Sequence, residues 1–302
     1  MVLDNLTNSR TTTLQGIRAI AQRDFRFVEA DVRACEPLFA EVQFDAVLHF
    51  AGLKSVSASV AAPREYRDVN VGGTRTLLRA MNRHGVKRLV FSSSASVYGD
   101  PDRNPIPEDA PLRPKSPYGE TKCEVEGLLH EQVVSDQRWC AVALRYFNPV
   151  GAHPSSLIGE DPLGPPENLM PILGQLARDE KEVQIFGADH PTPDGTCIRD
   201  YVHVCDVARG HIAALSCAPG KHIFNLGSGL GLSVLELVEA YRQASGRPLP
   251  YRFAPRRPGD VSTSVADPSR AAKQLGWRAE ADVQAMCRDA WAYQARRGSP
   301  SS

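Results

Sequence analysis

Short apolar segments, each followed by small or polar residues, constrain the fold of this chain more than any other feature. The run Ala46-Val47-Leu48-His49-Phe50 ends at Ala51-Gly52, and such a run suits a parallel strand buried on both faces. Small residues after the strand let the backbone approach a ligand closely. Further β-type segments occur at Val2–Asp4, Phe25–Val28, Arg88–Phe91 and Trp139–Phe147, with helical segments near Thr13, Asn70 and Pro117 between them. This alternation predicts an α/β fold with a parallel sheet.

Two segments in the first half of the chain carry candidate catalytic chemistry. A serine-rich stretch follows Phe91, where we expect the strand to end and a loop to begin. Pro117 suits the first turn of a helix, and Tyr118 and Lys122 share one face of that helix because they are four residues apart. The lysine ammonium favours the tyrosine phenolate and lowers its pKa, so Tyr118 is a candidate base at neutral pH. Such a pair alone is more often a solvated helix edge; the serines upstream favour catalysis.

The serine-rich stretch followed by Tyr-x-x-x-Lys resembles the catalytic set of the short-chain dehydrogenase/reductase superfamily. Four segments are similar to those of UDP-glucose 4-epimerases: HFAGLKSV (49–56), SSSASVYG (92–99), LRYFNPVGAHP (144–154) and RDYVHV (199–204). The resemblance runs from Leu3 to about residue 295. It implies a Rossmann-like doubly wound parallel sheet with a smaller α+β substrate domain. It places an NAD-binding domain at residues 1–149 and a UDP-sugar-binding domain at residues 150–302, with some segments returning to the first domain.

The resemblance also implies the activity and its catalytic residues. UDP-glucose and UDP-galactose would be interconverted through a 4-keto intermediate by transient hydride transfer to bound NAD. Tyr118 is the implied base, Lys122 lowers the pKa of Tyr118 and holds the nicotinamide ribose, and Ser94 hydrogen-bonds the oxygen at carbon 4. The implied cofactor contacts are Asp4, Asn5, Asn8, Asp31, Val32, Phe50, Ala51, Gly52, Lys54, Asn70, Ser92, Tyr118, Lys122 and Phe147. Without the resemblance, Asp4 would be a loop cap and Asn70 a surface amide ahead of a helix.

The implied substrate contacts are Lys54, Ser94, Tyr118, Asn148, Leu169, Ile185, Phe186, Arg199, Tyr201, Arg257, Asp260 and Ser264. Two arginines suit a diphosphate, because guanidinium groups bind phosphate oxygens in pairs. Arg256 and Arg257 alone would be a solvated surface pair, but followed by Pro258-Gly259-Asp260 they fit a phosphate-and-ribose clamp. The family position that matches Ser264 lies against the hexose. A small residue there occurs in members that also accept acetamido sugars, so UDP-N-acetylhexoses are implied as further substrates.

Family members open with a strand and a Gly-x-x-Gly-x-x-Gly loop, and we expect this chain to start after them. Two inner strand edges would then be unpaired, apolar surface would be uncovered, and NAD would bind poorly. An inactive, N-terminally truncated remnant is therefore one alternative. A nucleotide-sugar dehydratase or decarboxylase is another, although a dehydratase needs a carboxylate beside the serine and residues 92–96 have none. The segment Gly227–Gly231 imitates a dinucleotide loop, but it lies late in the chain and we predict a structural turn.

Composition excludes several other classes of protein. The 35 basic and 35 acidic side chains give a formal net charge of zero, so no overall field attracts nucleic acid or an anionic membrane. No stretch approaches the length of apolar residues that a membrane span needs. The seven cysteines are scattered and never spaced as Cys-x-x-Cys, so we expect reduced thiols and no metal site. These features predict a cytoplasmic enzyme, and the resemblance adds a homodimer.

Overall fold

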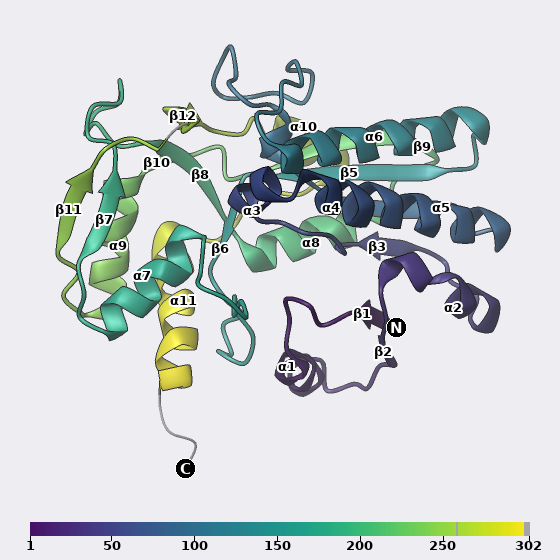
Figure 1. Ribbon diagram of the computed structural model, residues 1–302, viewed down its shortest axis with the longest axis horizontal. Helices are drawn as coiled ribbons and strands as arrows, with labels where there is room; N and C mark the ends of the chain where they lie inside the picture. The colour runs from purple at the N-terminus through teal and green to yellow at the C-terminus, as the bar shows by residue number, and fades with distance from the viewer. Residues whose placement is uncertain (258, 299–302) are drawn as a thin grey trace.

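Parallel strands with helices on both faces form the larger part of the computed structural model (Figure 1). The structure describes residues 1–257 and 259–298. Pro258 of the predicted clamp and residues 299–302 therefore lie outside the described residues. The α/β class expected from the sequence is confirmed.

The main sheet has four parallel strands in the order β3-β4-β5-β9. Their bounds are β3 (Val47–His49), β4 (Arg88–Ser94), β5 (Cys140–Tyr146) and β9 (Gly220–Leu226). Successive side chains of a strand point to opposite faces, so the sheet contributes to two separate cores. Leu89 and Phe91 of β4 pack with the helices on one face, whereas Val90 packs on the other face with Val207 and Trp277.

The first two strands, β1 (Val2–Asp4) and β2 (Phe27–Glu29), pair in parallel as a separate ribbon. Among the described residues, no strand joins this ribbon to β3. The run around β3 is consequently not buried on both faces, because Leu48 is 40% exposed and Phe50 is 56% exposed. The expectation of a strand buried on both faces is wrong here, whereas the expected unpaired edges and uncovered apolar surface are present.

Within the described residues, the first half of the chain supplies six α-helices, and the last two of them in sequence pack on one face of the main sheet. The six helices are α1 (Thr11–Ala21), α2 (Glu36–Glu41), α3 (Val56–Ala61), α4 (Pro63–Tyr66), α5 (Gly73–Arg83) and α6 (Pro117–Ser135), with 3-10 turns η1 (Val32–Ala34) and η3 (Ala95–Val97). A π-helical segment, η2 (Arg67–Gly72), joins α4 to α5. Asn70 lies inside this segment and does not precede the helix as the sequence suggested. Such π-turns are frequent at functional sites.

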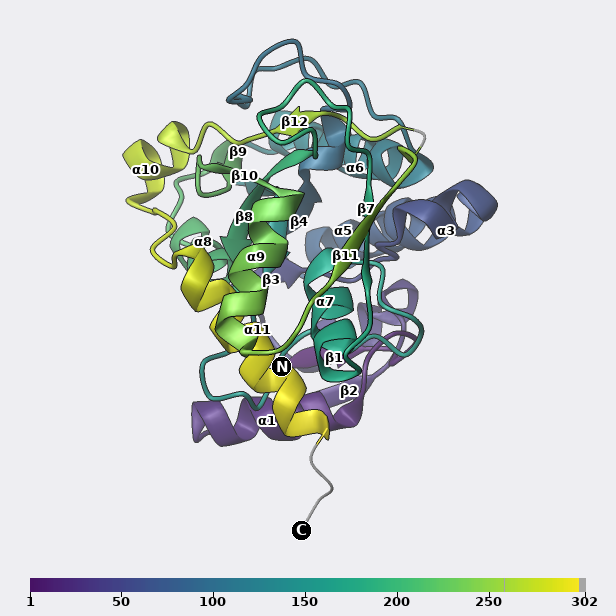
Figure 2. The same ribbon diagram turned by 90° about the vertical axis from the view of Figure 1, so that its left-hand side faces the viewer.

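The second half forms a smaller region on the left of Figure 1, seen face-on in Figure 2. Its elements are β6 (Asn148–Val150), α7 (Leu169–Arg178), β7 (Val183–Phe186), β8 (Ile198–His203), β10 (Gly231–Ser233), α9 (Val234–Ser245), β11 (Tyr251–Ala254), β12 (Thr263–Ser264) and α11 (Val283–Gly298). Two other helices of the second half, α8 (Val204–Ala214) and α10 (Ser269–Leu275), instead pack on the second face of the main sheet. Helices α7, α9 and α11 share one apolar core with β7 and β8. The division of the chain at residue 150 stays a prediction; β9 pairs with β5 of the first half.

Local sequence signals account for the ends of several elements. Ser233 and Glu236 form a reciprocal capping box at the start of α9, and Gly246 ends this helix with a φ of 62°. Residues 227–231 form a turn, in which the Ser228 and Gly229 amides donate to the Asp200 carboxylate. The predicted structural turn is therefore confirmed.

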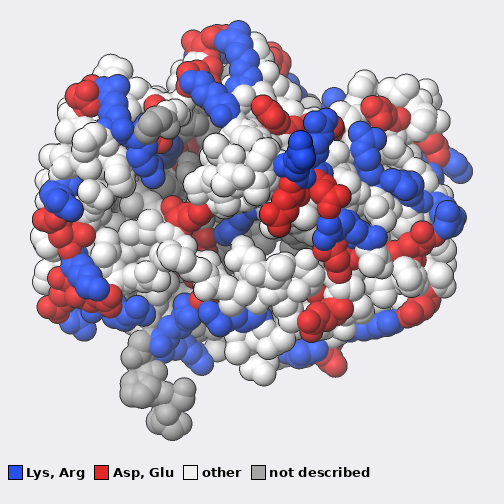
Figure 3. All heavy atoms as spheres, in the orientation of Figure 1, with Lys and Arg blue, Asp and Glu red and all other residues white. Residues whose placement is uncertain are grey.

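The surface shows no dominance of one charge. On the face drawn in Figure 3, basic and acidic side chains are interspersed. None of the helices within the described ranges has the length and apolar character needed to cross a bilayer. All seven cysteines are free thiols.

Candidate active site

The start of α6 brings the tyrosine–lysine pair against the end of β4. Ser116 caps the helix by accepting a hydrogen bond from the Gly119 amide at 3.2 Å. A Cβ on Gly119 would lie 2.8 Å from the Ser96 carbonyl oxygen, so only glycine allows the helix to approach η3 this closely. The serines differ from expectation, because β4 continues through Ser94. Ser92–Ser94 pair with Leu144–Tyr146 of β5, whereas the pairing with β3 ends at Phe91, so hydrogen bonds to β5 extend the strand beyond the apolar residues.

Lys122 is buried where α6 crosses the end of β4. Its Nζ donates to the Ser92 carbonyl oxygen at 2.7 Å and lies 5.5 Å from the centroid of the Tyr118 ring. Burial lowers the pKa of Lys122 to about 8, and the Glu126 carboxylate raises it in part. The ammonium is therefore mainly protonated at neutral pH.

Tyr118 differs from the sequence-based expectation in its acidity. Burial raises the pKa of its phenol above the ordinary value, and the hydrogen bond with the Ser94 hydroxyl lowers the pKa only in part. Lys122 is not among the groups that shift this pKa, so the expectation that Lys122 lowers the pKa of Tyr118 stays a prediction. Ser94 also accepts a hydrogen bond from the Ser96 amide, so its hydroxyl sits at the cap of η3.

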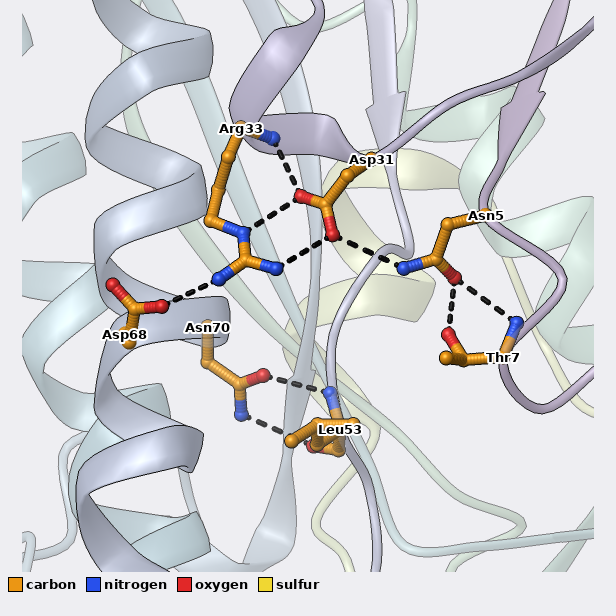
Figure 4. A network of polar contacts seen from close by, with 7 residues as sticks. All are labelled: Asn5, Thr7, Asp31, Arg33, Leu53, Asp68 and Asn70. Atoms are coloured by element: carbon orange, nitrogen blue, oxygen red, sulfur yellow. Dashed lines mark hydrogen bonds and ion pairs between the residues drawn. The ribbon is translucent and has the colours of Figure 1, made fainter.

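The predicted adenosine contacts form one polar network after β1 and β2 (Figure 4). Asn5 donates to the Asp31 carboxylate at 3.1 Å, and Arg33 binds the same carboxylate through two nitrogens at 2.8 Å. The Arg33 guanidinium holds the pKa of Asp31 well below its usual range. Asp4 accepts bonds from the Leu6 amide and the Ser9 hydroxyl through one oxygen, which is the behaviour of a loop cap.

The predicted cofactor loop after β3 is held by Asn70. The Leu53 amide donates to the Asn70 side-chain oxygen at 2.7 Å, and the Asn70 amide donates to the Leu53 carbonyl at 3.0 Å and to Thr121 Oγ1 at 3.1 Å (Figure 4). Asn70 thus ties residues 51–53 to the first turns of α6. Its contacts within the described residues position the loop, and its own contact with a cofactor stays a prediction.

The remaining predicted cofactor residues take different positions. Val32 packs against Gly73, and Ala51 packs in the core beneath α5. Phe147 is buried beside Tyr98, and Phe50 lies with its ring 4.6 Å from that of His211. Asn8 is exposed. The set therefore lies along one edge, at the carboxyl ends of the parallel strands, where ligands of doubly wound sheets bind.

The predicted diphosphate contacts gather around Asp260. Arg257 Nε donates to the Asp260 carboxylate at 3.0 Å, and Arg199 Nη2 lies 3.9 Å from its other oxygen. The Arg257 guanidinium lies 4.9 Å from the centroid of the Phe186 ring. Arg256 instead pairs with Asp189 on the surface. The structure therefore separates the two consecutive arginines, and only Arg257 faces the predicted site.

Three of the other predicted substrate residues, Asn148, Tyr201 and Ser264, lie on the small sheet centred on β8. Asn148 pairs with Tyr201, and Ser264 pairs with Arg199. The side chain of Ile185 is buried in the core with α7 and α9, so only its backbone can contact a ligand. Leu169 lies at the first turn of α7.

One apolar cluster joins the catalytic segment to the substrate segment. Ala95, Cys123 and Ala266 pack together around Tyr98. These residues are one or two positions from Ser94, Lys122 and Ser264, so the cluster fixes the three candidate residues in one region.

Sequence reasoning missed several acids in this region. Glu160 accepts from Lys54 at 3.0 Å and from Asn168 at 2.6 Å, and Glu167 accepts from Ser55 at 2.8 Å. No local pattern signals these pairs, because their partners are distant in sequence. Glu126 is different: it continues the Tyr118–Lys122 spacing by four residues, and that spacing could have identified it.

A Rossmann-like sheet with a serine, a tyrosine and a lysine at its carboxyl edge defines a nucleotide-dependent enzyme of the short-chain dehydrogenase/reductase class. Comparison with known proteins narrows the class. The model of the NAD dependent epimerase/dehydratase family matches residues 1–227. The chain is 49% identical to the UDP-glucose 4-epimerase of Bacillus subtilis over 97% of its own length and 89% of that protein.

Solved structures give the same result. A UDP-glucose 4-epimerase from Stenotrophomonas maltophila, with bound NAD and formylated UDP-arabinopyranose, superimposes with a TM-score of 0.95 at 47% identity and covers 98% of this chain and 90% of that one. The enzyme from Bifidobacterium longum, in complex with NAD+ and UDP, gives a TM-score of 0.93 at 46% identity, covering 97% and 90%. This chain belongs to the NAD-dependent epimerase/dehydratase family, on the UDP-glucose 4-epimerase branch.

Proposed function

We propose that this chain is an NAD-dependent UDP-hexose 4-epimerase that interconverts UDP-glucose and UDP-galactose. The observation that carries the proposal is the convergence of Tyr118, Lys122 and Ser94 at one end of the parallel sheet. The Arg199–Asp260–Arg257 cluster of the second half supports it. The relatives named above are UDP-glucose 4-epimerases, and two of them hold NAD with a uridine nucleotide.

The residues at the carboxyl edge fit a dinucleotide. Asn5, Asp4 and Asp31 present amide and carboxylate groups suited to ribose hydroxyls, and the loop after β3 presents backbone and small side chains. Lys122 can donate to a ribose hydroxyl while its remaining hydrogen bond stays on Ser92. When bound, NAD supplies a hydride acceptor and a positive charge.

The catalytic residues divide the remaining work. Tyr118 accepts the proton of the hydroxyl at carbon 4, and Ser94 donates a hydrogen bond to the same oxygen. Lys122 stabilises the phenolate of Tyr118. Because burial disfavours the phenolate, the tyrosine becomes a base only when further positive charge compensates for its desolvation.

The substrate half of the site holds the nucleotide and leaves room for the hexose. Arg199 and Arg257 can bind the two phosphates, with Asp260 orienting both guanidinium groups. Ser264 of β12 pairs with Arg199 of β8. The small side chain of Ser264 leaves volume for an acetamido group. We therefore include UDP-N-acetylhexoses among the proposed substrates. A cytoplasmic location and a homodimeric state belong to the same proposal, and the free cysteines support the former.

The experiment is an NMR assay of purified protein incubated with UDP-galactose and excess NAD. We expect a mixture of UDP-galactose and UDP-glucose, and loss of turnover in Tyr118→Phe. Formation of a 4-keto-6-deoxy sugar would instead indicate a dehydratase, and absence of any product would contradict the proposal.

A further inference from the structure

A buried ion pair lies one helical turn beyond Lys122. Glu126 of α6 binds the Arg145 guanidinium of β5 through both oxygens, with Nη2–Oε2 at 2.5 Å and Nε–Oε1 at 2.9 Å. The side chains are 4% and 2% exposed. A buried pair of this kind contributes little net stability compared with apolar packing. We therefore looked for a role of the pair other than stabilising the fold.

The pair is bonded to the strand that carries the catalytic serine. Ser93 Oγ donates to Glu126 Oε1 at 2.6 Å. Ser93 stands between Ser92, whose carbonyl accepts from Lys122, and Ser94. The Glu126 carboxylate therefore fixes the end of β4 against α6 from the side opposite to Ser94.

Arg145 is itself fully engaged, which prevents the pair from shifting. Its Nη1 donates to the Tyr98 hydroxyl at 2.9 Å and to the Glu108 carbonyl at 3.1 Å. Tyr98 donates to the Asn225 side chain at 2.6 Å. A satisfied buried network of this kind is rigid and specifies one arrangement.

We propose that Glu126 is a positioning residue of the active site, which acts through its hydrogen bond with Ser93 and its place one helical turn from Lys122 to hold the Ser94–Tyr118–Lys122 arrangement. The proposal rests on the function proposed above. Glu126 itself touches neither substrate nor cofactor in this arrangement, and its effect is transmitted along α6 and β4.

The electrostatic part of the role can be followed in Lys122. Burial alone drives the pKa of Lys122 down, and the Glu126 carboxylate opposes this. The titratable or charged groups that face Lys122 and Glu126 come from several elements. They are His49 from β3, Tyr98 and Glu108 from the segment after β4, Tyr118 and Cys123 from α6, and Arg145 from β5. Removing the Glu126 charge should therefore lower the pKa of Lys122 further, so that its ammonium is lost at a lower pH.

The test compares Glu126→Gln with the parent protein. The alkaline limb of the pH profile of kcat should move to lower pH by about 1 unit, with KM for UDP-galactose changed less than twofold. Glu126→Asp, which keeps the charge, should restore the position of the limb. Glu124→Gln, which removes a carboxylate paired with Arg67 on the surface of the same helix, should leave the profile unchanged.

Two further measurements keep the outcome decisive. Titration of the Lys122 Nζ by NMR in ¹⁵N-lysine-labelled protein needs no turnover. An unmoved pKa in Glu126→Gln therefore overturns the inference, whereas a parent without turnover overturns only the proposed function. If Glu126→Gln does not fold, Ser93→Ala decides: a three- to tenfold lower kcat with unchanged KM supports positioning, and an unchanged kcat overturns it.

Discussion

Asp200 lies at the centre of the small sheet, and its replacement offers a sharp test of how that sheet is held. The side chain is fully buried. One carboxylate oxygen accepts from the Ser228 amide and hydroxyl, both at 2.7 Å, and the other accepts from the Gly229 amide at 2.9 Å and the Ala266 amide at 3.0 Å. The perturbation is Asp200→Asn, which keeps the shape and removes half of the acceptors.

The magnitude follows from these four bonds. The asparagine oxygen can keep the two Ser228 bonds, but its NH₂ then faces the N–H groups of Gly229 and Ala266. A buried donor without a partner costs about 1–3 kcal/mol, so two cost about 2–6 kcal/mol. Burial raises the pKa of Asp200, which means that the carboxylate also carries a desolvation cost that asparagine avoids. We therefore expect Asp200→Asn to lower the free energy of unfolding by about 2–4 kcal/mol, the lower part of the range for two unpaired donors.

The assay is urea unfolding followed by fluorescence. In Asp200→Asn the urea concentration at the unfolding midpoint should fall, while the dependence of the unfolding free energy on urea concentration stays unchanged. Ser228→Ala is the matched control: it removes the hydroxyl that donates to Asp200 and accepts from the exposed Leu230 amide, and it should cost about 1 kcal/mol or less. UDP affinity should fall as well, because Asp200 is flanked by Arg199 and Tyr201. A loss in Asp200→Asn no greater than that of Ser228→Ala would refute this reasoning.

Four further outcomes follow from the site and its surroundings. Tyr118→Phe should lower kcat by ~10²–10⁴-fold while calorimetry shows nearly unchanged UDP affinity; near-normal turnover would remove the mechanism. Lys122→Met should shift the kcat profile to higher pH, because the phenol loses its neighbouring charge; an unshifted profile would contradict that role. Ser264→Tyr should lower turnover of UDP-N-acetylglucosamine roughly ten- to a hundredfold and that of UDP-galactose much less, whereas equal rates in both forms would mean that the residue does not gate the pocket. His49, buried against Thr74, has a pKa lowered by burial to about 3 from its ordinary 6.5. The unfolded chain therefore binds this proton first, and at pH 5 stability should be about 2 kcal/mol lower than at neutral pH; urea unfolding of His49→Gln should lack this part of the acid loss.

The sequence predicted the fold because local and long-range signals agree in its central part. The β-type run before Ser92, the proline start of α6 and the capping box of α9 each express a short-range rule. The uncovered faces of Leu48 and Phe50 could not be predicted from that run, because burial depends on which strand lies next to β3. The extension of β4 through Ser94 has the same origin, because the neighbouring strand β5 supplies the pairing partners.

The candidate site was predictable in its residues and less so in their interactions. Tyr118 and Lys122 were placed on one helical face by their spacing alone, but the pKa of Tyr118 depends on burial, which the spacing does not contain. The bond of Asn70 to Leu53 could not be predicted, because it depends on a π-turn within a longer helix that turns the Asn70 amide toward that loop. The ion pair of Glu126 with Arg145 joins a helix to a strand, and only the helical spacing of Glu126 could have signalled it.

The measurement that tests the central claim most directly uses UDP-galactose carrying deuterium at carbon 4. The protein is incubated with this substrate and NAD, and the sugar nucleotides are analysed by NMR and mass spectrometry. The account predicts UDP-glucose that retains the deuterium at carbon 4, because the hydrogen removed from that carbon returns to it on the opposite face. Loss of the label to solvent, or a product altered at carbon 6, would contradict the account.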